Sequence, residues 1–408
     1  MTDREISLKR AEELKKRNAP FEEARKKIEK GSDDQFIKRY NAQKEKIIAE
    51  FECAADEWDN WTWQIKNRVS NVKFLSKILN LGDPECDVIE KVSKKYRWAI
   101  TPYYLALINP ADLNDPVRLM SIPGERELNE SGCPDPMCEN QTNPAGNITQ
   151  RYPDRLILNI TNACAMFCRH CQRRRKINSS DSNSSADEIK ESIQYIRDNS
   201  NIRDVIITGG DPLALPDSFL EELLSEIRKV KHVEIIRIGS RTPVTMPQRI
   251  TASLAEMIKK YHPVYFNSQF NHPHEITLES IAACNRLSDA GIPLGNQMVL
   301  LNGVNNDKFV VQLLNNELLK MRVRPYYIFH AKQVVGTVHF HTTVDDDLEI
   351  MEYLRGHASG LAIPAYVINA PEGQGKIPLL PQYIIGKDDD FITMRTWEGN
   401  IIKYPNEC

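Results

Sequence analysis

The sequence predicts an α/β fold, a partial TIM-like barrel of about six β/α units with an N-terminal helical extension. Short strand-like runs alternate with helical stretches after Arg151, the helical stretches carry apolar stripes, and polar residues follow the strands. Strands and helices that alternate in this way indicate a parallel sheet with right-handed crossovers. Because six or so units fall short of an eightfold barrel, we expect an incomplete one.

Residues 1–108 are expected to form the helical extension. Charged residues dominate its first fifty positions, with favourable i,i+4 pairs such as Glu12–Lys16, and Thr2 with Glu5 resembles a capping box. Acidic residues interleaved with the basic ones would cancel the field that a nucleic acid needs. A solvated helix is therefore favoured over a nucleic-acid-binding arm.

Three further segments complete the expected organisation. Residues 109–150 are rich in Pro, Asn, Gly and Asp and predict a loop or linker. Residues 151–385 would form the barrel and carry the site, and residues 386–408 a C-terminal segment. A loop as long as 109–150 is expected either to be functional or to wrap another element.

The barrel segment holds seven strand-like runs and six helical stretches. The runs are Leu156–Ile160, Val205–Thr208, Glu234–Ile238, Val264–Asn267, Gln297–Leu301, Tyr326–Phe329 and Tyr366–Ile368. The helical stretches are Asp187–Asp198, Asp217–Lys231, Ala252–Tyr261, Leu278–Asp289, Lys308–Met321 and Asp346–Arg355. Polar residues follow the runs, among them Asp211, Arg241 and Asn369, and the carboxyl ends of parallel strands are where such folds place their sites.

Composition excludes several classes of protein. The chain has 408 residues, a hydrophobic fraction of 41% and a net charge of −3, so neither disorder nor a global attraction to nucleic acid or anionic lipid is expected. No apolar run approaches the ~18–20 residues of a membrane span, and no signal peptide is evident at the start. We therefore expect a cytoplasmic protein that binds neither membrane nor nucleic acid.

The cysteines indicate metal chemistry. Three of the nine, Cys164, Cys168 and Cys171, follow the first barrel strand with the spacing C-x3-C-x2-C. Soft thiolates select iron–sulfur clusters, zinc or Cu(I). Structural zinc would need a fourth ligand, for which His170 is awkwardly placed beside Cys171. An iron–sulfur cluster with one open iron is favoured.

This cysteine triplet resembles the signature of radical S-adenosylmethionine (SAM) enzymes, in which SAM binds the open iron of a [4Fe-4S] cluster and is cleaved to a radical. Gly209, Gly210 and Asp211, after the second strand, resemble the glycine motif of these enzymes, whose polar groups would bind the SAM amino group. The small residues would let the backbone approach a ligand closely. The resemblance implies a partial barrel of the radical SAM type.

Within the radical SAM enzymes, the sequence resembles the lysine 2,3-aminomutase family over about four-fifths of its length. The resemblance rests on Trp98–Tyr104, Arg151–Arg155, Cys168–Arg175, Arg322–Tyr327, Pro364–Pro371 and Gly373–Lys376. These enzymes use SAM, the cluster and pyridoxal 5′-phosphate (PLP) to move an amino group from C2 to C3. The family match implies a small-molecule amino acid substrate and an external electron donor, and leaves a homo-oligomer open.

The resemblance also implies roles for single residues. Lys376 matches the lysine that carries PLP, Arg173 the residue that grips the substrate α-carboxylate, and His170 and Gln297 positions near SAM. Arg151 and Arg155 match the residues that hold the PLP phosphate. Guanidinium groups suit both anions because they bind them bidentately. Without the family match, Lys376 would be taken for a surface lysine in a turn.

The sequence departs from the family at the far end of the substrate. Two aspartates recognise the distal ammonium in the lysine enzymes, and this chain has Lys332 and Asn369 at those positions. A substrate carboxylate would meet an ammonium and an amide donor there, whereas a substrate ammonium would be repelled. We therefore expect L-glutamate as the substrate and β-glutamate as the product. An aminomutase for lysine or another amino acid is the first alternative.

A second departure concerns zinc and gives the alternative of a different class. The lysine enzymes bind zinc through a C-terminal cysteine cluster and one further cysteine, where this chain has only Cys408 and, near the other position, Asp307. The match therefore gives no prediction of structural zinc. A zinc-stabilised interaction protein, with the cysteine triplet as its metal site, is the second alternative.

Overall fold

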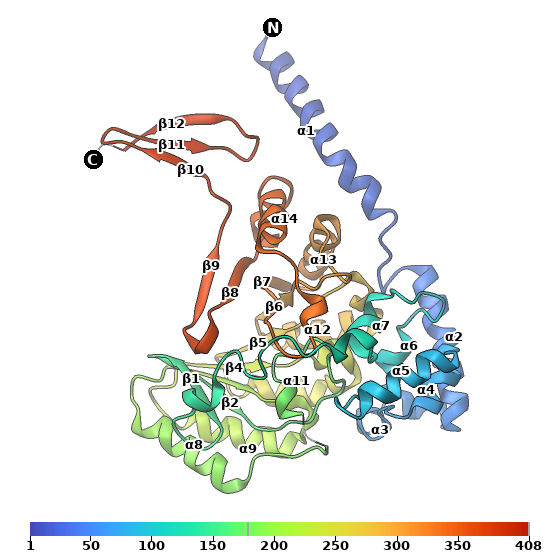
Figure 1. Cartoon of the computed structure of the whole chain (residues 1–408). Coiled ribbons are helices and arrows are strands. Elements are labelled where there is room, and N and C mark those ends of the chain that lie inside the picture. The colour runs from blue at the N-terminus through green and yellow to red at the C-terminus, as the bar shows by residue number, and fades with distance from the viewer. Residues whose placement is uncertain (178, 407–408) are drawn as a thin grey trace.

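A curled sheet forms the centre of the computed structural model, which describes residues 1–177 and 179–406. Its nine strands follow one another in chain order from β1 to β9, and β2 to β8 are parallel. β1 and β9 lie antiparallel at the two edges, and no pairing joins them within the described residues. The sheet is thus an open partial barrel covered by helices, which confirms the predicted fold class (Figure 1).

The elements of the barrel follow the expected alternation. The strands are Ile148–Tyr152 (β1), Arg155–Asn159 (β2), Asp204–Thr208 (β3), Ile235–Gly239 (β4), Val264–Ser268 (β5), Leu294–Val299 (β6), Val323–Phe329 (β7), Ala365–Asn369 (β8) and Lys376–Leu379 (β9). The helices that cross between parallel strands are Ala186–Asp198 (α8), Asp217–Arg228 (α9), Ala252–Lys259 (α11), Leu278–Asp289 (α12), Lys308–Lys320 (α13) and Val344–His357 (α14). A short helix, Thr242–Thr245 (α10), follows β4.

One strand lies earlier than its apolar run predicted. The expected run Gln297–Leu301 corresponds to β6, which begins at Leu294 and ends at Val299. The polar Asn296 belongs inside the strand because its side chain bonds both the N–H and the carbonyl of Phe270, at 2.7 and 2.9 Å. A buried amide side chain that hydrogen-bonds backbone groups in this way is polar, so a search for apolar residues does not find it.

Alternation along the strands decides which side chains reach the interior of the curl. In β3, Val205 and Ile207 are buried against the surrounding helices, whereas Asp204, Ile206 and Thr208 face the cavity that the sheet encloses. A strand exposes every second residue to each side. The fold therefore presents a ring of strand residues and post-strand loops to one interior space.

The N-terminal region is helical, as expected. Its helices are Asp3–Arg25 (α1), Asp34–Phe51 (α2), Trp61–Lys66 (α3), Val72–Leu79 (α4), Asp83–Ser93 (α5) and Pro102–Ala106 (α6). Thr2 and Glu5 form the predicted capping box at the start of α1. Most of α1 extends from the body (Figure 1), and Arg10 and Arg17 pair with Glu398. Among the described helices, none combines the length and apolar character of a membrane span.

Residues 109–150 contain more regular structure than a linker. They include helix Pro116–Ser121 (α7), two short 3-10 turns at Glu125–Leu128 and Glu139–Thr142, and the start of β1. The C-terminal part forms a separate antiparallel sheet from Ile384–Lys387 (β10), Phe391–Arg395 (β11) and Ile401–Pro405 (β12). Cys408 lies outside the described residues.

Candidate active site

A cavity of about 1120 Å³ opens at the carboxyl ends of the parallel strands. Every site residue that the sequence predicted lines it: Arg151, Arg155, Cys164, Cys168, His170, Cys171, Arg173, Gly209, Gly210, Asp211, Gln297, Lys332, Asn369 and Lys376. These residues come from segments more than 200 positions apart. The structure thus gathers the whole predicted set around one space.

The cysteines lie on the loop after β2. Two hydrogen bonds to other segments fix this loop, from Phe167 N–H to Ala99 O (3.0 Å) and from Arg169 N–H to Met120 O (2.9 Å). Among the residues described, no three His, Cys, Asp or Glu side chains are arranged to hold a single metal ion. Burial raises the pKa of the Cys164 and Cys171 thiols, so a strongly cationic centre is needed to keep them as thiolates.

The glycine turn packs directly on the cysteine loop. A Cβ at Gly209, where φ is +144°, would lie 2.4 Å from Thr161 O, and one at Gly210 would lie 2.3 Å from Ala163 O. Asp211, which is 5% exposed, accepts hydrogen bonds from Ser240 Oγ (2.7 Å) and from the N–H of Arg241 (2.8 Å). Its side chain therefore ties the end of β3 to the end of β4.

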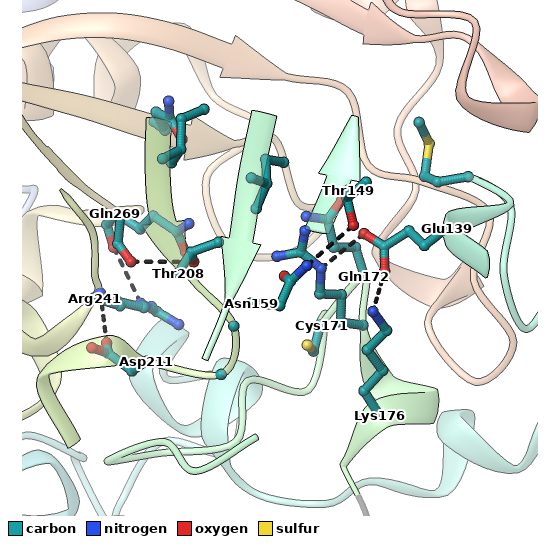
Figure 2. A pocket seen from close by; sticks show the side chains of 18 of the residues that line it. Glu139, Thr149, Asn159, Cys171, Gln172, Lys176, Thr208, Asp211, Arg241 and Gln269 are labelled. Atoms are coloured by element: carbon teal, nitrogen blue, oxygen red, sulfur yellow. Dashed lines mark hydrogen bonds and ion pairs between the residues drawn. The ribbon is translucent and has the colours of Figure 1, made fainter. Parts of the chain in front are cut away.

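Arg241 is a residue whose part in the site the sequence did not reveal. Its buried guanidinium donates to Cys168 Sγ at 2.8 Å, pairs with Glu275 at 2.7 Å and donates to Gln269 O at 3.1 Å. Figure 2 shows Arg241 between Asp211 and Gln269 on one side of the cavity. The sequence marked Arg241 only as a polar residue after a strand, because its sulfur contact spans 73 positions.

Lys376 begins β9 on the other side of the cavity. Its backbone N–H donates to Tyr152 Oη at 2.9 Å, and its Nζ lies 5.4 and 5.7 Å from the ring centres of Tyr152 and Tyr327. Burial, with Arg237 and Arg155 nearby, lowers the pKa of Lys376 to about 8. A lysine in such surroundings is a readier nucleophile than a surface lysine.

Three of the arginines that line the cavity are those that the sequence predicted to bind anions. Arg155 lies over the Tyr152 ring at 3.8 Å, and the buried Nε of Arg151 has no hydrogen-bond partner among the described residues. Arg173 donates from Nε to Glu139 at 2.9 Å. Because buried donors are almost always paired in a working site, the Arg151 Nε indicates an anion that completes it.

Lys332 and Asn369 lie in the same cavity, after β7 and at the end of β8. Lys332 Nζ donates to the amide oxygen of Gln172, and within the described residues no carboxylate pairs with it. The Asn369 side-chain nitrogen is buried and lacks an acceptor there. Burial, with Arg173 and Arg151 close by, lowers the pKa of Lys332 to about 7. Asn369 is thus a donor without an acceptor, and Lys332 is a cation whose described partner is an amide and not a carboxylate.

Comparison with known proteins agrees with this geometry. The Radical SAM superfamily model matches residues 158–311, and the Lysine-2,3-aminomutase model matches residues 351–407. A glutamate 2,3-aminomutase from Clostridioides difficile is 56% identical over 403 residues, which cover 98% of this chain and 95% of that protein. An L-lysine 2,3-aminomutase from Clostridium subterminale is 48% identical over 350 residues, which cover 85% of this chain and 84% of that protein.

The chain belongs to the lysine 2,3-aminomutase family of radical SAM enzymes. It is accordingly an isomerase, a radical SAM aminomutase whose cofactors are a [4Fe-4S] cluster, SAM and PLP.

Family membership confirms the resemblance found in the sequence and removes the zinc-stabilised interaction protein as an alternative. The residues present fit the family's cofactors. The three cysteines share one loop, the glycine turn admits no Cβ, and Arg151 Nε and His170 Nδ1 are buried donors or acceptors without a described partner. Burial holds the pKa of His170 well below its usual range, so the ring is neutral at pH 7.

Proposed function

We propose that this enzyme moves the amino group of L-glutamate from C2 to C3 and releases β-glutamate. The observation that carries the proposal is the far end of the cavity, where Lys332 and Asn369 offer hydrogen-bond donors without a carboxylate partner among the described residues. The C. difficile relative, a glutamate 2,3-aminomutase, supports the same substrate.

The charge of this region favours a dicarboxylate substrate. Arg151, Arg173 and Lys376 all lower the pKa of Lys332, and Glu139 alone among its named neighbours raises it. An incoming carboxylate would accept charge-assisted hydrogen bonds of about 1.5–3 kcal/mol each. The ammonium of lysine would instead be brought against cations in a largely desolvated site.

The remaining roles follow the family match. The cluster and SAM supply a carbon-centred radical when bound, and PLP supplies the π bond that lets the amino group migrate. We assign the cluster to Cys164, Cys168 and Cys171, and SAM to the glycine turn with His170 and Gln297. Arg151, Arg155 and Lys376 are assigned to PLP, and Arg173 to the substrate α-carboxylate.

The second candidate substrate is lysine, because a relative named L-lysine 2,3-aminomutase is 48% identical to this chain. An assay with both amino acids separates the two. Anaerobically reconstituted enzyme with SAM, PLP and reductant is incubated with L-glutamate or L-lysine, and the 3-amino products are separated by chromatography. We expect β-glutamate alone. Turnover of lysine without glutamate would overturn the assignment of Lys332 and Asn369.

The proposal extends to the surroundings of the enzyme. We place it in the cytoplasm, with a free amino acid as its substrate and an external one-electron donor that reduces the cluster. Anaerobically purified protein should contain about four irons per chain when loaded.

A further inference from the structure

The 3-10 turn Glu139–Thr142 places a buried carboxylate among the cations of the site, although it belongs to the segment expected as a linker. Glu139 is 4% exposed. Its Oε1 accepts from Arg173 Nε at 2.9 Å and lies 3.5 Å from Arg151 Nη2, while its Oε2 lies 3.0 Å from Arg175 and 3.1 Å from Lys176. One side chain thus joins the arginines assigned above to two different anions.

We propose that Glu139 is a positioning residue that holds Arg173 and Arg151 in register for the substrate α-carboxylate and the PLP phosphate. The proposal rests on the roles given to these arginines under the proposed function. Glu139 would couple the two anion sites, so a change at Glu139 should affect the binding of both the substrate and PLP.

The geometry at Arg173 supports positioning rather than competition with the substrate. Glu139 engages Nε, on the stem side of the guanidinium, and no described group bonds the two terminal nitrogens. A carboxylate can therefore approach the open end of the fork and accept two parallel hydrogen bonds. Glu139 fixes the direction of the fork without occupying that end.

Other contacts fix Glu139 itself. Its backbone N–H donates to Asp135 Oδ2 at 2.8 Å, and the same carboxylate lies 2.8 Å from Arg175 Nη2. Close by, the N–H of Glu372 donates to Pro136 O at 2.9 Å, which ties this segment to the turn before Lys376. The 3-10 turn Glu139–Thr142 therefore lies between the cysteine loop, β1 and the start of β9. Figure 2 shows Glu139 and Lys176 joined beside Gln172.

The electrostatics agree with a permanent carboxylate. Burial alone would raise the pKa of Glu139, but Arg173 and Lys176 lower it well below its usual range. The side chain stays ionised through the neutral range. Without it, Arg151, Arg173, Arg175 and Lys176 would repel one another and separate.

The test variant is Glu139→Asp, which keeps the charge and withdraws the carboxylate by one methylene. We expect the KM of the amino acid substrate to rise about tenfold with kcat changed less than about twofold, because a misdirected Arg173 weakens ground state and transition state alike. The Kd of PLP, measured by absorbance titration of the chain, should rise about threefold, since the contact with Arg151 is longer.

The matched control is Glu127→Asp. Glu127, 1% exposed in the same segment, is bonded by Arg169 at 2.9 Å and paired with Arg174, but it does not line the cavity. We expect Glu127→Asp to lower Tm without changing the Kd of PLP or the KM. A matching pattern in Glu139→Asp, with Tm lowered and both constants unchanged, would make Glu139 merely structural and overturn the proposal.

A lower KM in Glu139→Asp would also overturn the proposal. If Glu139 occupied the place of the substrate, a shorter side chain would vacate that place, and KM would fall. The result is independent of which amino acid turns over, because lysine carries the same α-carboxylate. Failure of glutamate turnover in the wild-type enzyme would count against the proposed substrate alone, and the PLP titration would still test Glu139.

Discussion

On the cysteine side of the cavity, formed by residues 161–171, 209–211 and 240–241, the protein satisfies its own buried polar side chains with the exception of His170 Nδ1. Asp211 is bonded by Ser240 and the N–H of Arg241, and the glycine turn lies against the cysteine loop without room for a Cβ. On the anion side, formed by Arg151, Arg155, Arg173, Lys332, Asn369 and Lys376, donors are left without acceptors and two lysines have lowered pKa values. Steric fit dominates one side and uncompensated charge the other, so substitutions should fail differently on each.

The largest effect is expected on the anion side. Lys332→Asp combined with Asn369→Asp restores the two acidic residues of the lysine enzymes and places two carboxylates where the glutamate side chain would bind. We expect kcat/KM for glutamate to fall at least about a thousandfold, on the order of 4 kcal/mol. Steady-state assays measure it, with Lys260→Asp, a charge change at an exposed residue just after α11 that does not line the cavity, as the control. Unchanged kinetics in the double variant would place the distal carboxylate elsewhere.

A smaller effect, of a different kind, is expected on the cysteine side. Gly209→Ala forces a Cβ to within 2.4 Å of a backbone oxygen at a positive φ, which should cost about 3 kcal/mol of folding free energy and displace the cysteine loop. Iron content per chain and Tm should both fall. In Gly239→Ala, where the nearest atom to a Cβ would be 3.6 Å away, both should remain near wild type. Equal behaviour of the two variants would contradict the steric account.

The two sides also differ in how far the sequence predicted them. Cys164, Cys168 and Cys171 lie within eight positions and the glycine motif within three, and periodicity places each motif after a strand, so their position in the fold could be predicted directly. Lys332 and Asn369 were identified only through the family match. Both line the cavity, but no local pattern distinguishes Lys332 from a surface lysine.

Residues whose partners are distant in the chain escaped prediction. Glu139 lies in a segment whose Pro, Asn and Gly content predicted a linker, and Arg173, its nearest partner, is 34 positions away. Arg241, which follows β4, meets Cys168, which follows β2, 73 positions earlier in the chain. Composition reports the local conformation of such segments but carries no information on which cation a carboxylate will meet. Tertiary pairing of this kind requires the fold.

The smallest predicted effect is a pH dependence confined to the anion side. The pKa of Lys332 is lowered to about 7, chiefly by burial and by Arg173, Arg151 and Lys376, against the raising effect of Glu139. Its ammonium therefore predominates below pH 7 and is lost above it. Because a carboxylate binds the ammonium form, KM for glutamate should rise up to about tenfold per pH unit above 7, with kcat much less affected.

Lys332→Arg separates this titration from that of the substrate. A guanidinium stays protonated across the range, so the KM of the variant should be nearly flat from pH 6.5 to 8.5 wherever the wild-type value rises, and titration of the substrate amine would be common to both. Parallel profiles for the two enzymes would show that Lys332 does not titrate against the substrate. The contrast between the cysteine side and the anion side would then lose its electrostatic basis at Lys332. Asn369 alone would have to account for binding of the distal carboxylate.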